Sequence, residues 1–151
     1  MSGMISPAVG APALIRFRFV SGYNNTTTTI KLGTIVAYDI LNTTDGAGFV
    51  PCATSLYGGI AGVALETIAP GGGTASTGEY TDRIVMRGTV LALVQLTSGG
   101  VAPGDKLIPA AGGVLNWSAA AAAAVSQPNF TYAGLITTTT DLALCPVVVN
   151  L

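Results

Sequence analysis

Four acidic side chains are the first residues of this sequence to test for chemistry: Glu66, Glu79, Asp82 and Asp105. Two carboxylates at a fixed separation can share acid and base roles, and carboxylates at alternate positions of a short loop can bind calcium. The spacing of these four matches no calcium loop or other oxygen-ligand motif. The chain also contains no histidine, which removes the common catalytic triads and most zinc and iron sites. The sequence therefore predicts a protein that is not an enzyme and needs no metal or other cofactor.

The glycine-rich segment 99–107 has some of the residues of a phosphate-binding loop. Such a loop needs a lysine directly after its second glycine, and then a hydroxyl residue that reaches magnesium. Here Asp105 separates the glycine from the lysine, and Leu107 stands in place of the hydroxyl. We therefore expect a Pro-Gly-Asp β-turn that leads into a strand. The three glycines at 71–73 are followed by no helical pattern and predict a loop.

The two cysteines, Cys52 and Cys145, lie far apart and form no Cys-x-x-Cys motif. The N-terminus has no basic region followed by an unbroken apolar run, so we expect no secretory signal. Two buried free thiols are then the simplest expectation, and a disulfide between them stays open as an alternative.

The composition of the 151 residues indicates one domain and excludes several functions. Only 9% of the residues are charged and the net charge is -1, so the chain lacks the basic surface that nucleic acids require. Half of the residues are hydrophobic, which argues against disorder, yet no apolar run is long enough to span a membrane as a helix. Because so few charges give little repulsion between copies, we expect other subunits to cover part of the surface. A threonine-rich monomer is the alternative.

The N-terminal region combines an extended segment with an amphipathic strand. Residues 1–12 contain prolines and glycines without periodicity and predict an extended arm. The chain then alternates apolar and cationic side chains through Ile15, Arg16, Phe17, Arg18 and Phe19. A period of two puts the apolar side chains on one face of a strand and the arginines on the other. We expect these five residues to contact a neighbouring subunit or a larger assembly that the chain joins.

The rest of the chain predicts many short strands between Gly and Pro turns, which is typical of an all-β, compact barrel-like fold. Residues 118–125 are the one helical candidate, because Ser118 offers an N-cap and alanine has the highest helix propensity. The apolar run at 90–94 predicts a strand buried on both faces, and no repeat of fixed period is visible. We expect an N-terminal arm with its first strand at 1–32 and one β-barrel-like domain at 33–151. The predicted strands are residues 14–20, 26–32, 34–38, 49–54, 60–67, 82–87, 89–96, 106–108, 114–117, 132–137 and 142–149.

Several short segments carry a family resemblance. They are GVALET at 62–67, IVMRGTV at 84–90, VAPGDKL at 101–107, YAGLI at 132–136 and VVV at 147–149. In this order they resemble the small capsid decoration, or cement, proteins of tailed bacteriophages, whose core is a compact barrel-like domain called a β-tulip. The resemblance covers about residues 33–151. Residues 69–78 and 119–124 depart from it as additions, and residues 1–32 lie outside it.

The resemblance implies a structural virion protein that is made in the host cytoplasm and docks on the capsid exterior. Its partners would be the major capsid protein and other copies of itself, commonly in a homotrimer. There it would cement neighbouring capsid subunits and stabilise the head against internal DNA pressure. The composition adds that no nucleic acid, membrane or small-molecule substrate is expected.

Two other functions stay open. A secreted or surface-displayed binding module, lectin-like or adhesive, would also suit a threonine-rich β surface. A small hydrolase with a serine or carboxylate site is the other, although the missing histidine disfavours it.

The strand at 14–20 gives the sharpest expectation of a contact. An unpaired strand with an apolar face is an aggregation hazard unless a neighbour covers it. We expect Ile15, Phe17 and Phe19 to bury against that neighbour by strand addition, with Arg16 and Arg18 facing carboxylates or water. The alternative is that the strand belongs to the barrel of its own chain.

Overall fold

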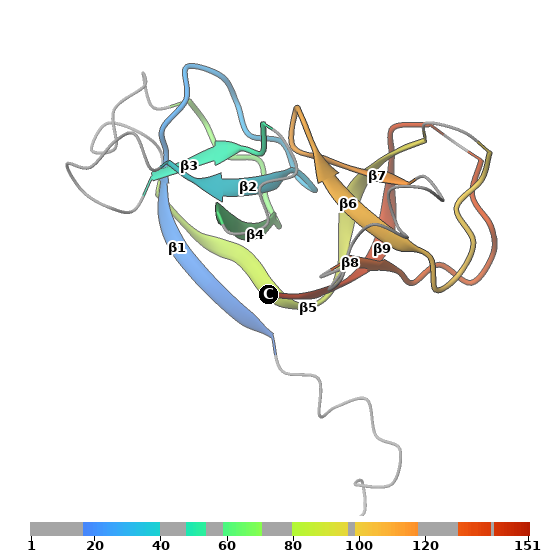
Figure 1. Cartoon of the computed structure of the whole chain (residues 1–151). Coiled ribbons are helices and arrows are strands. Elements are labelled where there is room, and N and C mark those ends of the chain that lie inside the picture. Colours follow the sequence, from blue (N-terminus) through green and yellow to red (C-terminus); the bar gives the residue numbers. More distant parts are fainter. Residues whose placement is uncertain are drawn as a thin grey trace, which may run out of the picture.

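A computed structural model describes residues 17–39, 48–53, 59–70, 80–96, 99–117, 130–139 and 141–151. These residues form strands and turns with no helix (Figure 1), so the all-β prediction is confirmed. Accordingly, no helix in these ranges could span a membrane. The helix predicted at 118–125 lies outside the described residues. The strands are β1 (Arg18–Asn24), β2 (Ile35–Tyr38), β3 (Gly48–Pro51), β4 (Ile60–Ala64), β5 (Tyr80–Leu96), β6 (Lys106–Ala110), β7 (Val114–Trp117), β8 (Phe130–Tyr132) and β9 (Ala143–Asn150).

The strands close into two five-stranded rings that share β5. The first ring runs β1-β3-β2-β4-β5 and closes where β1 pairs with β5. The second runs β5-β7-β6-β8-β9 and closes where β9 pairs with β5. Strand β5 has 17 residues, which is long enough to belong to both rings. Its first half pairs with β1 and β4, and its second half pairs with β7 and β9. In Figure 1, β5 runs from the lobe of β1 to β4 into the lobe of β6 to β9.

The two rings have the same topology, so the fold contains an internal duplication. In each ring the first strand pairs in parallel with the third, as β1 with β3 and β5 with β7. Every other pairing in both rings is antiparallel. Strands β1 to β5 thus correspond in order to strands β5 to β9. The structure corrects the expectation that the chain has no repeat.

Equivalent turns support the duplication. The turn 31–34 is closed by a backbone N–H to carbonyl bond of 3.1 Å, and the turn 102–105 by one of 3.0 Å. The third residue of each turn is a glycine, Gly33 with a φ of +83° and Gly104 with a φ of +89°. A positive φ at this position is the reason that such turns favour glycine. The second of them confirms the predicted Pro-Gly-Asp turn.

A short antiparallel bridge precedes each of these turns. In the first ring, Ile30 and Ile68 exchange two backbone hydrogen bonds of 3.0 and 2.8 Å. In the second ring, Val101 and Thr138 exchange two of 2.9 and 3.0 Å. The two rings are therefore equivalent at these two bridges as well as in their strands.

One cluster of buried side chains fills the first ring, and a larger one fills the second ring and the space between the rings. The first cluster consists of Ile30, Val36, Phe49, Ala61, Ala64, Ile68 and Ile84. The larger cluster joins second-ring residues such as Leu107 and Leu115 to first-ring residues such as Ile35 and Val63.

The middle strands of the first ring are buried on both faces. On β2, Ile35 belongs to the larger cluster and the next residue, Val36, to the first-ring cluster. On β4, Val63 likewise belongs to the larger cluster and Ala64 to the first-ring cluster. Because side chains alternate along a strand, β2 and β4 lie between the two rings. The run at 90–94 is different: Leu91 is exposed, so the expected burial on both faces is wrong there.

We expect the two rings to unfold in one transition, because they share β5 and the larger cluster. The change Phe49→Ala in the first ring should lower the free energy of unfolding by about 3–5 kcal/mol. The fluorescence of Trp117, which is the only tryptophan and lies in the second ring, should report this loss during denaturation. Thr89→Ala, on the exposed side of β5, is the control and should change stability by less than about 0.5 kcal/mol. A Trp117 transition that Phe49→Ala leaves unchanged would contradict the shared unfolding.

Candidate interaction surface

β1 has an unpaired edge at the outside of the first ring (Figure 1). One edge pairs with β5 from Arg18 to Tyr23, whereas the other pairs with β3 only at Tyr23 and Asn24. Within the described part of the chain, nothing pairs with that second edge over residues 18–22. The strand thus belongs to the ring of its own chain, which is the alternative that the sequence left open. Its free edge can still accept a further strand.

Two phenylalanines stand exposed at the start of this strand. Phe17 and Phe19 are each about half exposed, and their rings stack with centroids 6.2 Å apart at an interplanar angle of 23°. The Phe17 ring lies against Gly88 of β5, where a Cβ would collide with it. Because glycine has no Cβ, position 88 leaves room for the Phe17 side chain to pack against the backbone of β5. Large apolar side chains grouped on a surface are typical of contacts with other proteins.

Two arginines lie directly opposite each other on the other face of the same two strands. Arg18 on β1 is the cross-strand partner of Arg87 on β5, and both are exposed. Like charges in this position destabilise a sheet. No carboxylate of the described residues forms an ion pair with either guanidinium. The pair is therefore free to bind an anionic group of a partner.

We call Phe17, Arg18, Phe19 and Arg87 the aromatic–arginine strip. The sequence pattern indicates the first three, and the structure brings them together with the fourth. Ile15 and Arg16, which the same pattern includes, lie outside the described residues. The sequence pattern does not identify Arg87, because only the register between β1 and β5 places this residue opposite Arg18. The signal in the sequence is the Arg-Gly step between two predicted strands, which does not reveal its partner strand.

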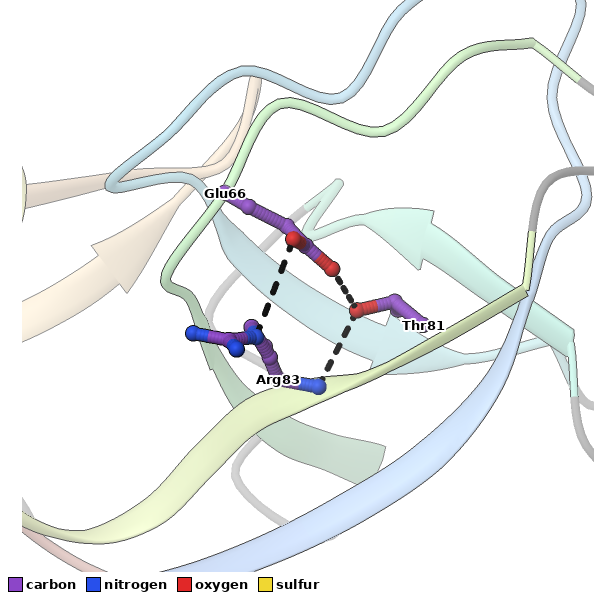
Figure 2. A network of polar contacts seen from close by, with 3 residues as sticks. All are labelled: Glu66, Thr81 and Arg83. Atoms are coloured by element: carbon purple, nitrogen blue, oxygen red, sulfur yellow. Dashed lines mark hydrogen bonds and ion pairs between the residues drawn. The ribbon is translucent and has the colours of Figure 1, made fainter.

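One of the four acidic candidates, Glu66, belongs to a separate polar network (Figure 2). The Thr81 hydroxyl donates to Glu66 Oε1 at 2.6 Å and accepts the Arg83 N–H at 3.0 Å. Arg83 Nε lies 3.9 Å from Glu66 Oε2. These contacts tie the segment after β4 to the beginning of β5. Both hydrogen-bonding roles of the hydroxyl are used within the network, so its role is structural.

The other acidic candidates lie elsewhere. Asp105 Oδ2 accepts the Ala102 N–H at 2.8 Å and so stabilises its own turn. Asp82 is exposed on β5, and Glu79 lies outside the described residues. Where the structure describes the chain, no group of three or more His, Cys, Asp or Glu side chains could hold a metal ion.

Cys52 and Cys145 are both buried free thiols, as the simplest expectation had it. Burial raises the pKa of the Cys145 thiol. Burial also raises the pKa of Tyr132, and the neighbouring Cys145 adds to this effect. Both groups are therefore held in their neutral, protonated forms inside the second ring.

We expect the stability of the protein to fall as the pH rises above about 9. The folded state keeps the Cys145 and Tyr132 protons at pH values where the unfolded state has already released them. This difference in pKa stabilises the fold below the unfolded values and is lost as the pH rises through the folded ones. Melting temperatures from about pH 8 to pH 11 would measure the fall, and Cys145→Ala should make it shallower. An identical slope in the variant would show that the thiol contributes nothing.

Leu142 is the one non-glycine residue with a positive φ in the described chain, at +49°. This left-handed conformation is costly for leucine and easy for asparagine. The side chain is 56% exposed, so little burial compensates for the strain. Backbone strain of this kind is often found where a side chain has a functional contact.

We expect Leu142→Asn to stabilise the isolated chain by about 1 kcal/mol, because the new residue tolerates the left-handed backbone. Chemical denaturation at submicromolar protein concentration would measure the gain without any self-association. Leu91→Asn, an exposed leucine within a regular strand, is the matched control and should not stabilise. A loss of stability at position 142 would mean that the leucine is held by contacts within the chain.

No protein-family model matches this chain, and no curated protein matches it either. The resemblance to decoration proteins therefore depends on the short sequence segments alone.

Proposed function

We propose that this chain is a structural virion protein that binds the outer surface of a phage capsid and cements neighbouring major capsid protein subunits. In this proposal it acts without enzymatic chemistry or a cofactor, stabilises the head against internal DNA pressure, and associates with copies of itself. The family resemblance of the sequence supplies the class of partner. The surface of the first ring supplies a means of contact.

The observation that carries the proposal is the aromatic–arginine strip, which lies at the start of β1 and across its pairing with β5. Two stacked aromatic side chains on one face at the start of β1, and two like charges on the other face, stabilise the isolated chain little. They become favourable when a partner covers the rings and sets carboxylates against the arginines. The free backbone edge beside them can pair with an extended segment of that partner. A subunit of an assembled shell can provide all three contacts at once.

Binding to capsids that lack this protein tests the proposal. We expect the double change Phe17→Ala and Phe19→Ala to weaken binding by about tenfold or more, since each buried aromatic typically contributes at least about 1 kcal/mol. Cosedimentation of the purified chain with such capsids would measure it. Tyr80→Ala removes a similarly exposed aromatic from the same ring and serves as the control. Wild-type protein that does not sediment with the capsids would refute the proposed function.

Arg87→Gln provides a second, independent comparison. In the isolated chain this change removes a like-charge contact, so the free energy of unfolding should stay the same or rise by about 0.2–1 kcal/mol. On capsids the same change should weaken binding, because a carboxylate of the partner loses its cation. A loss of both stability and binding would indicate that the arginine serves the fold and not the partner.

A further inference from the structure

The second ring contains two extra residues at one connection, and they expose two large apolar side chains. In the first ring the chain passes from Ala64, at the end of β4, to the bridge at Ile68. In the second ring the equivalent path runs from Tyr132 to the bridge at Thr138, which is two residues longer. The equivalence follows from matching hydrogen bonds, in which the Ala64 and Tyr132 N–H groups donate to the last residue of the 31–34 and 102–105 turns. The longer path carries Leu135 and Ile136, which are 95% and 77% exposed.

The backbone under these two side chains is braced. The buried Tyr132 hydroxyl donates to the Ile136 carbonyl at 2.9 Å. Gly134 lies against the same hydroxyl, where any Cβ would collide with it. The bridge between Val101 and Thr138 fixes the far end. We call Leu135 and Ile136 the apolar knob, and its fixed shape means that little conformational entropy is lost when it binds.

A groove between the two rings has the matching chemistry. It has a volume of about 400 Å³, within the range of sites that hold small apolar groups. Its apolar lining comes from both rings, and its lining contains no carboxylate. Its apolar lining residues include Pro51, Leu93, Val114 and Leu142, and Lys31 is its one charged group. The strained Leu142 lies in this lining.

We propose that the apolar knob of one chain binds in the inter-ring groove of a second copy. Leu135 and Ile136 are exposed and so do not occupy the groove of their own chain, whereas a second copy brings the same knob to that groove. The one charged group of the groove, Lys31, is exposed, so its ammonium can stay in water when an apolar group binds beside it. A net charge of -1 gives little repulsion between copies. The contact is head-to-tail, since knob and groove are different surfaces, and it closes into a ring when the rotation between copies allows. This proposal rests on the proposed function in one respect: it supplies the contact through which the self-association named in that function takes place.

Mass measurement by light scattering at micromolar concentration tests the contact without any capsid. The wild-type chain should have a mass that is a multiple of the single chain. Two variants should each be monomeric: Leu135→Asp with Ile136→Asp, which removes the knob, and Leu142→Asp, which alters the groove. Asp tolerates the left-handed backbone at position 142, so the groove variant should fold. Thr67→Asp, an exposed residue of the equivalent first-ring connection, is the matched control and should stay oligomeric.

Mixing the two variants gives the decisive result. The groove variant keeps its knob and the knob variant keeps its groove, so together they should form a one-to-one heterodimer and nothing larger. An interface that joins identical surfaces would not recover in the mixture. A monomeric wild-type chain, an oligomeric knob variant or a mixture that stays monomeric would each overturn the proposal. Capsid binding is measured separately with the Phe17 and Phe19 variant, so either proposal can fail while the other stands.

Discussion

The sharing of β5 between two rings is the constraint on which the rest of the structure depends. One strand of 17 residues supplies the last strand of the first ring and the first strand of the second. Neither ring can close without it, because β1 and β9 both complete their rings by pairing with it. This arrangement also fixes the distance between the rings, so that the outer faces of β2 and β4 are buried against the second ring. Backbone bonds across the junction, such as the 2.7 Å bond from Ile35 N–H to the Gly113 carbonyl, satisfy the polar groups that this burial removes from water.

The sequence predicts most of the strands but not the duplication. The strand predicted at 26–32 is wrong, since that segment forms turns and one isolated bridge, and most of the strand predicted at 132–137 is wrong as well. Strand positions follow from local alternation and from glycine and proline turns, which survive in each ring. A repeat, by contrast, is visible only if equivalent core positions keep similar side chains. Here the registers make Gly62 equivalent to Phe130 and Ala64 equivalent to Tyr132. The two cores are filled by different combinations of large and small side chains. Packing requires a certain total volume, but it does not require the same residue at each equivalent position.

The candidate surface shows the same division between local and long-range information. The period of two finds Phe17, Arg18 and Phe19, because one strand determines their relative faces. It cannot find Arg87, whose contact with Arg18 depends on a pairing across more than sixty residues of sequence. Nor can it find the exposure of Leu135 and Ile136. Their connection is recognised as unusual only when it is compared with the equivalent connection of the first ring.

Duplication with a shared strand also explains how one small chain carries two different surfaces. Each ring is closed by backbone pairing and by its own apolar interior, so residues on the outside can diverge with little effect on folding. The first ring leaves one edge of β1 unpaired, and the start of that strand exposes two aromatic side chains on one face and a pair of arginines, shared with β5, on the other. The second ring lengthens one connection and stiffens it with a tyrosine hydroxyl. Because the aromatic–arginine strip lies in the first ring and the apolar knob in the second, the two proposed contacts, with a shell and with a second copy, can form on one chain at the same time.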